Sequence, residues 1–187
     1  MKKVIIKTII LTVISTVVFS CGKDKKTPEV VSDDNEVEEV SKVDLNHTDS
    51  RSDVVFADTS VTKIYHQYLN IKKALVNANN EMARTAAKSL AESISEEESN
   101  KQLKATAKLV SLTKDLKKQR DFLVTLTSEV EKLITNAEIT SGEVHKQFCP
   151  MAFEGEGGYW LSDSKEVRNP YFGNKMLKCG SVKATIQ

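Results

Sequence analysis

The chain has 187 residues, of which 27 are lysine or arginine and 26 are aspartate or glutamate, so its formal net charge is +1. A chain of this length has room for one domain of ordinary size and a tail, which argues against two large domains. It also lacks the basic excess of nucleic-acid-binding proteins, so we expect no nucleic-acid partner.

The first twenty residues have the composition of an export signal. Lys2, Lys3 and Lys7 form a positive start, and residues 9–19 form an apolar run that is too short to span a bilayer. We therefore expect residues 1–20 to be a signal peptide.

Residues 18–21, Val-Phe-Ser-Cys, resemble the lipobox of bacterial lipoproteins, whose cysteine is acylated. We expect Cys21 to carry a covalent lipid that anchors the protein to a membrane of the cell envelope. Gly22 follows in place of the aspartate that retains some lipoproteins in the inner membrane, which favours the outer membrane without specifying its periplasmic or surface face. The alternative is an ordinary signal peptide in which Cys21 is a bystander.

Residues 22–58 carry five basic and eleven acidic side chains and show no apolar periodicity. Such a composition cannot bury a core, so we expect residues 21–58 to comprise the lipidated cysteine and a disordered acidic tether. A flexible coil of this length reaches roughly 30 to 35 Å from its anchor. The functional alternative is an acidic tail that collects metal or binds a partner.

Four segments between residues 59 and 135 show the apolar period of amphipathic helices. Their stripes are Val61, Ile64, Tyr68, Ile71 and Leu75; Met82, Ala86, Leu90 and Ile94; Leu103, Ala107 and Val110; and Leu116, Leu123, Leu126, Val130 and Leu133. The polar patch at 111–115 predicts a break between the third and fourth segments.

The expected helix starts follow from capping residues. They are Thr59 or Ser60 for the first helix, Asn79 or Asn80 for the second, and a capping box of Ser99 and Gln102 for the third. The pattern predicts a mainly α fold, an antiparallel bundle of about four helices, with Tyr65, Tyr68 and Met82 in its core. The domain would span residues 59–187, and a turn-rich C-terminal module would occupy residues 143–187.

The C-terminal module differs from the helical part in composition. Six of the seven glycines and six of the eleven aromatic residues lie from Gly142 onward, and both remaining cysteines lie there as well. Glycine-rich turns around aromatic side chains predict a compact module with an aromatic core.

Four sulfur-bearing residues lie near the two ends of this module. Cys149 and Met151 would share one side of an extended segment, and Met176 and Cys179 would share one side of a helical turn. If the ends of the module meet, the four sulfurs converge into a thiolate and thioether set that selects soft ions such as Cu(I). His145 could add an imidazole, although it would need a helical turn to reach the side of Cys149.

Other interpretations of the two cysteines stay open. A Cys149–Cys179 disulfide would close 29 intervening residues and stabilise the fold by about 3 to 4 kcal/mol, and the thiols could also be unrelated and buried. A Cys149 nucleophile beside His145 lacks any oxyanion-hole or third-residue signal. We expect no enzymatic activity, no catalytic residue and no small-molecule substrate.

Four blocks of the module resemble a known bacterial family. They are Phe148–Ala152, Tyr159–Ser162, Val167–Gly173 and Met176–Gly180. The blocks are similar to a domain of unknown function that occurs in stand-alone envelope lipoproteins and as the C-terminal extension of periplasmic adaptor subunits of copper and silver efflux pumps. Tyr65, Arg120 and Phe122 also fit its helical part, so the resemblance runs over about residues 59–186.

The resemblance implies a role in heavy-metal handling in the envelope, with Cu(I) or Ag(I) held at Cys149, Met151, Met176 and Cys179 and efflux-pump components as partners. The chain lacks the barrel and hairpin parts of the pump adaptors, so we do not expect it to be an adaptor itself. The main rival hypothesis is an interaction protein whose module is stapled by a disulfide and binds no metal. A thiol-based redox protein is a third.

Overall fold

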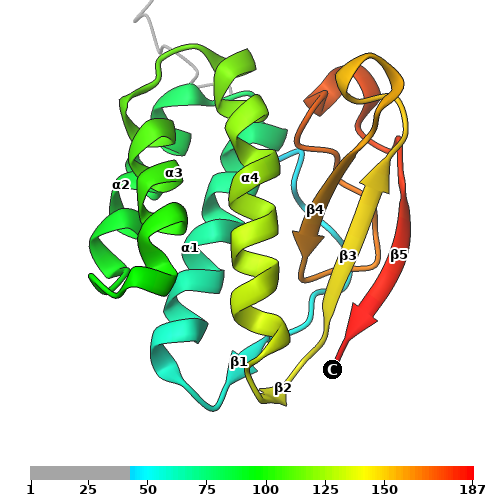
Figure 1. The fold of residues 1–187 in the computed structure, drawn as a ribbon. Helices are drawn as coiled ribbons and strands as arrows, with labels where there is room; N and C mark the ends of the chain where they lie inside the picture. Colours follow the sequence, from blue (N-terminus) through cyan, green and yellow to red (C-terminus); the bar gives the residue numbers. More distant parts are fainter. Residues whose placement is uncertain (1–42) are drawn as a thin grey trace, which may run out of the picture. The chain divides into compact units, whose positions relative to one another are not determined.

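In the computed structural model, which describes residues 43–187, helices pack against one face of a small antiparallel sheet (Figure 1). The expected signal peptide, Cys21 and the tether up to residue 42 lie outside the described residues. Over residues 43–187 the structure contains no helix with the length and apolar character needed to cross a membrane.

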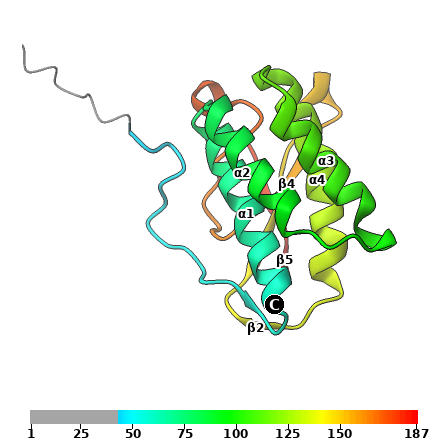
Figure 2. The same cartoon turned by 90° about the vertical axis from the view of Figure 1, so that its left-hand side faces the viewer.

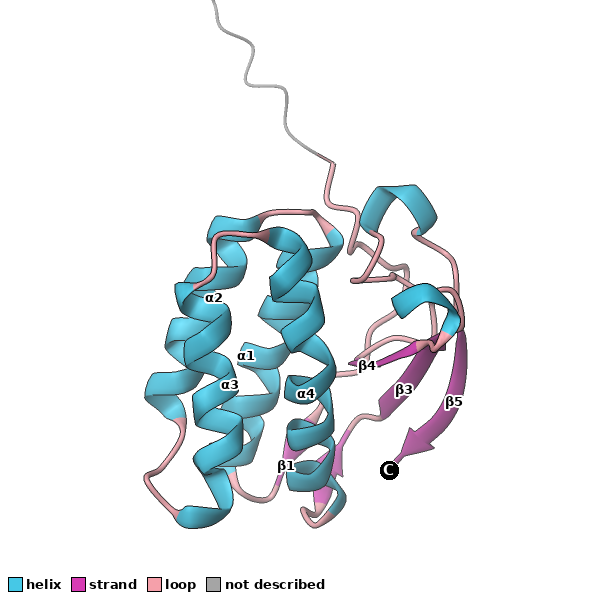
Figure 3. Ribbon diagram, turned by 45° about the horizontal axis from the view of Figure 1, so that its top comes forward, coloured by secondary structure: helices cyan, strands magenta, loops and turns pink. Residues whose placement is uncertain are grey.

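Four helices form the larger layer, as predicted. They are α1 (Thr59–Val76), α2 (Asn80–Ser93), α3 (Lys101–Leu112) and α4 (Leu116–Thr135). Consecutive helices run in opposite directions through short connections, and α4 packs beside α1 as well as α3 (Figure 3). The break predicted at 111–115 is confirmed, since α3 ends at Leu112 and α4 begins at Leu116.

Short polar side chains set the helix starts. Asn79 caps α2, as predicted, by accepting the Met82 N–H at 3.0 Å. The prediction for α1 was wrong by one residue, because Asp58 accepts the Ser60 N–H at 2.7 Å.

The predicted capping box of α3 was also wrong. Ser99 lies inside a short 3₁₀ turn, η1 (Glu98–Asn100), that leads directly into the helix. The residue before α3, Asn100, makes no side-chain capping hydrogen bond. The 3₁₀ turn therefore takes the place of a side-chain cap at this start.

The core follows most of the predicted stripes. Ile64, Tyr68 and Leu90 are buried, whereas Met82 is 51% exposed. The buried face of α2 keeps the predicted Leu90, but Ala83 and Ala87 take the places expected for Met82 and Ala86, and Ala91 joins them. These small side chains let α2 approach its neighbours closely.

The segment 43–58 corrects the predicted tether. It descends beside α1 to a short strand, β1 (Val55–Phe56), which pairs with β2 (Ile139–Ser141) (Figure 2). Val54 and Phe56 are each 1% exposed. The folded region thus begins earlier than residue 59, because a few apolar residues without any period supply one strand and two core side chains.

The C-terminal module is a three-stranded antiparallel sheet, which the turn-rich composition did not reveal. Its order is β4 (Gly158–Ser162), β3 (Val144–Cys149), β5 (Ser181–Ile186), with short 3₁₀ turns η2 (Phe153–Gly155) and η3 (Gly173–Met176) between the strands. In the register of β3 and β4, His145 lies opposite Ser162 and Cys149 opposite Gly158.

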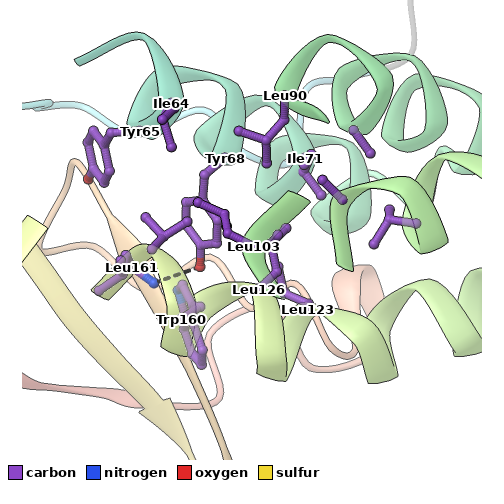
Figure 4. Close-up of a cluster of buried hydrophobic side chains, with 14 of the residues drawn as sticks. Ile64, Tyr65, Tyr68, Ile71, Leu90, Leu103, Leu123, Leu126, Trp160 and Leu161 are labelled. Carbon is purple, nitrogen blue, oxygen red and sulfur yellow. Dashed lines mark hydrogen bonds between the residues drawn. The ribbon is translucent and has the colours of Figure 1, made fainter. Parts of the chain in front are cut away.

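One tyrosine joins the helices to the sheet. The Tyr68 hydroxyl on α1 accepts the Leu161 N–H of β4 at 3.0 Å (Figure 4). It also lies 2.8 Å from the Thr127 Oγ1 of α4. Burial raises the pKa of Tyr68 to about 12, so the phenol keeps the proton that it can donate to Thr127. Three elements therefore meet at one buried oxygen.

Replacing Tyr68 tests whether its hydroxyl joins the helices to the sheet. We expect Tyr68→Phe to lower the free energy of unfolding by about 1 to 3 kcal/mol, because the Leu161 N–H would be left buried without an acceptor. Tyr65→Phe is the matched control: Tyr65 is as deeply buried on the same helix, but its hydroxyl has no hydrogen-bond partner among residues 43–187. In urea denaturation, Tyr65→Phe should leave the free energy of unfolding unchanged or raise it. Equal losses of unfolding free energy in both variants would contradict the proposed role of the Tyr68 hydroxyl in joining the helices to the sheet.

Candidate functional site

The two cysteines of the module meet, as the convergence hypothesis required. Cys149 ends β3 and Cys179 lies two residues before β5, and their Sγ atoms are 2.9 Å apart. Cys149 is fully buried, whereas Cys179 is partly exposed. Pairing of β3 with β5 brings the sulfurs together, since Phe148 lies opposite Ser181 in the sheet.

Both methionines adjoin Cys179 through their backbones. The Met151 backbone lies close enough to the Cys179 thiol to lower its pKa, and the Cys179 N–H donates to the Met176 carbonyl oxygen at 3.0 Å. The side chains of Met151 and Met176 are 55% and 38% exposed. The thioethers therefore belong to residues that touch Cys179 and remain accessible from solvent.

Asn169 organises the loop that carries Cys179, a role that sequence reasoning missed. Its Nδ2 donates to the Cys179 carbonyl oxygen at 2.9 Å, and its Oδ1 accepts the Tyr171 N–H at 2.8 Å. Its own N–H donates to the Leu177 carbonyl oxygen at 2.8 Å. The signal that the sequence offers is the Asn169-Pro170 pair, which marks a turn and whose asparagine side chain can also bond nearby backbone.

Arg120 fixes the same loop to the helices. Its Nε donates to the Pro170 carbonyl oxygen at 2.9 Å and its Nη2 to the Leu75 carbonyl oxygen at 3.0 Å. Burial lowers the pKa of Arg120, which remains charged because its usual value is so high. The loop of Cys179 is thus tied to the C-terminal end of α1 through a side chain of α4.

The turn after Cys149 is strained. Phe153 and Glu154 have φ of 52° and 59°, a region that side chains other than glycine rarely occupy. The turn is closed by the Ala152 carbonyl oxygen, which accepts the N–H groups of Gly155 and Gly157 at 3.2 and 2.8 Å. Strain of this kind persists where the surroundings determine the conformation, as they often do at functional sites.

Aromatic residues pack behind the sulfur pair, and Trp160 lies in the aromatic core that the composition of the module predicted. Trp160 is fully buried and packs edge-to-face on Tyr171, with ring centroids 6.0 Å apart. The ring of Trp160 also lies against Gly180, the neighbour of Cys179. The partly exposed Met151 lines a groove of about 830 Å³ between α4 and the module, together with Arg120, Phe153 and Phe172.

The local electrostatics do not favour a reactive thiolate at Cys179. The hydrogen bond with Cys149, followed by burial, raises the pKa of the Cys179 thiol. Thiol-based redox catalysis uses a lowered thiol pKa. Metal ions also bind the thiolate, so metal binding here would release protons.

His145 does not join the sulfurs. Since β3 is a strand, the four residues from His145 to Cys149 span about 13 Å along it. His145 is buried, its Nδ1 lies 3.2 Å from the Thr185 Oγ1, and burial lowers its pKa. The structure therefore does not place the His145 imidazole beside the two sulfurs. Within residues 43–187, no three His, Cys, Asp or Glu side chains are grouped as they would be around a metal ion.

Residues 64–142 match a family model described as "Protein of unknown function (DUF3347)". The match begins within α1 and ends just before β3, so it covers most of α1 and all of α2, α3 and α4 and excludes Cys149 and Cys179. No curated protein and no solved structure matches the chain. The resemblance to a domain of unknown function is thus confirmed for the helical part.

Two glycines of the strained turn give a paired stability test. A Cβ at Gly157, where φ is 85°, would overlap the ring of Phe148 and lie 3.3 Å from the Cys149 carbonyl oxygen, whereas one at Gly155, with φ of 100°, would meet nothing within 4 Å. Gly155→Ala should cost about 1 to 2 kcal/mol from the backbone alone. Gly157→Ala should cost a further 1 to 3 kcal/mol, approximately, from overpacking. Equal unfolding free energies in urea would contradict this account of the turn.

Proposed function

We propose that the protein is a membrane-anchored envelope lipoprotein that binds soft metal ions, Cu(I) or Ag(I), through Cys149 and Cys179. The observation that carries the proposal is the 2.9 Å approach of two sulfurs from segments 30 residues apart. The protein would act as a binding or transfer protein, without enzymatic activity.

The donor chemistry fits such an ion. Two thiolates supply negative charge and high affinity for a soft monovalent cation, and thioethers are the other soft ligand that proteins offer. Met151 and Met176 would supply the thioethers, since both adjoin Cys179 and both side chains are exposed. A bound ion would therefore be held by charge from the cysteines and stay exchangeable through the methionines.

The expected anchor gives this chemistry its setting. Signal cleavage after residue 20 and acylation of Cys21 would place the domain on the outer membrane, behind the acidic segment that precedes residue 43. Lipidation would consume one of three cysteines and leave Cys149 and Cys179 as the thiols able to bind metal. The resemblance to extensions of efflux adaptors suggests that pump components receive or deliver the ion.

A metal titration tests the proposal. The reduced protein should take up about one equivalent of Cu(I) or Ag(I) in competition with a chromophoric chelator. Cys179→Ser should abolish effective competition, and Met151→Ala should weaken it by about 10- to 100-fold, the range typical of residues that support a metal site.

Met82→Ala is the matched control, because Met82 is equally exposed but lies on α2. It should bind as the unaltered protein does. Failure of the reduced protein to compete, or equal losses in Met82→Ala and Met151→Ala, would contradict the proposed site.

The same 2.9 Å approach favours a second candidate, an interaction protein whose module is stapled by a Cys149–Cys179 disulfide. A disulfide bond is about 2.05 Å long, so a shift of less than about 1 Å would close it. Closure removes two protons and two electrons, which an oxidising disulfide in the envelope would accept as it becomes a dithiol. The loop constraint would stabilise the module by about 3 to 4 kcal/mol.

Mass spectrometry of the mature protein, isolated without reductant and treated with an alkylating reagent, separates the two candidates. Soft-metal binding predicts two alkylated thiols after the metal is removed by a chelator, or a bridge that mild dithiols open readily. A bridge that resists mild reduction, in a protein that binds no Ag(I) once opened, would support the stapled interaction protein.

A further inference from the structure

Lys72 is a fully buried cation without a carboxylate partner. It lies on α1 with 1% exposure, and its Nζ donates to the Ser162 Oγ at 3.3 Å. No carboxylate oxygen in residues 43–187 lies within salt-bridge distance of this ammonium group. Buried charges in proteins are normally paired, and an ammonium has three donors to satisfy.

The charges nearby balance one another and leave Lys72 in excess. The Arg51 Nη1 lies 3.6 Å from the Asp163 Oδ2, and the Lys73 Nζ lies 2.8 Å from the Asp44 Oδ2. The Arg168 Nη2, a third cation near Lys72, lies 3.2 Å from the Glu166 Oε2. Burial lowers the pKa of Lys72 to about 8, with Asp163 opposing the shift, so the side chain is still mostly charged at neutral pH. The cluster thus carries one uncompensated positive charge.

A polar cavity opens beside this lysine. Its volume is about 370 Å³, and its lining includes Lys72, Arg51, Asp163, Asn46 and Asn70. Asn46 is 3% exposed, and its Oδ1 has no hydrogen-bond partner among the described residues. The cavity therefore combines a cation with unused donors and a buried acceptor that lacks a donor.

We infer that this cavity binds a small monovalent carboxylate that carries its own hydrogen-bond donor, a hydroxycarboxylate. The carboxylate would accept hydrogen bonds from Lys72 and neutralise it, and the hydroxyl would donate to the Asn46 Oδ1. A neutral or zwitterionic ligand would leave the buried charge uncompensated. The volume lies at the lower end of the range for small-molecule pockets, which limits the ligand to a few carbon atoms.

This site is separate from the sulfur site. Ser162, the partner of Lys72, lies at the opposite end of the β3–β4 ladder from Gly158, which faces Cys149. The inference therefore goes beyond the proposed metal binding and can succeed or fail independently of it.

A glycolate titration tests the site, because glycolate carries both a carboxylate and a hydroxyl. With ionic strength held constant by potassium chloride, glycolate should raise the melting temperature saturably, by roughly 3 to 6 °C at ten times its dissociation constant. In Lys72→Met the saturable rise should disappear, and this variant should fold, because methionine fills a similar volume without a buried charge.

Lys63→Met is the matched control, since Lys63 is an exposed lysine on the same helix. It should respond to glycolate as the unaltered protein does. The absence of a saturable rise in the unaltered protein, or an equal rise in Lys72→Met, would overturn the inference. Should Lys72→Met not fold, the lysine side-chain NMR signals of the unaltered protein decide: one buried lysine must shift saturably with glycolate.

Discussion

The hydroxyl of Tyr68 is the point on which the arrangement of the two layers depends. It accepts the Leu161 N–H of β4 (Figure 4) and lies within hydrogen-bond distance of Thr127 on α4. A strand at the edge of a sheet presents unpaired backbone groups, and burying such a group without a partner is costly. The Tyr68 hydroxyl accepts a hydrogen bond from the Leu161 N–H, one such group of β4, and this lets β4 lie against α1 and α4. Its position in turn fixes β3 and β5, because β4 pairs with β3 and β3 pairs with β5.

The sulfur site depends on these contacts, because Cys149 lies on β3 and Cys179 lies just before β5. Cys149 ends the central strand, and Cys179 is held by Asn169, which is itself fully buried. Arg120 then ties the loop of Asn169 back to the helices through the Pro170 carbonyl oxygen. Because hydrogen bonds to the backbone hold both segments, the sulfurs are brought together before any ion or oxidant acts on them. Such preorganisation is what a small binding site requires.

Sequence periodicity predicted the helical layer well and the sheet layer poorly, for physical reasons. The apolar stripes of α1 and α4 are long, and a helix whose one side faces a core must repeat every 3.6 residues. The module has strands of five or six residues with buried polar side chains such as Gln147, so no alternation was visible. The segment before α1 was misassigned because Val54 and Phe56 are too few to show any period, although both enter the core.

Spacing also predicted the meeting of Cys149 and Cys179, but only as a condition on the two ends of the module. The sequence could not show that His145 lies in a strand, about 13 Å from Cys149, or that Asn169 holds the loop of Cys179. The burial of Lys72 could not be predicted from the sequence either, since a lysine within an amphipathic helix is ordinarily solvated. Each of these depends on contacts between distant segments, which a local pattern does not encode.

In the metal binding that we propose, the sulfurs of the C-terminal module form the first coordination shell of a soft ion. X-ray absorption at the metal edge of the protein loaded with Cu(I) or Ag(I) measures that shell directly. We expect sulfur neighbours alone, with fewer sulfur ligands when both Met151 and Met176 are replaced by leucine. A shell of nitrogen or oxygen atoms, or one unchanged in that double variant, would contradict it.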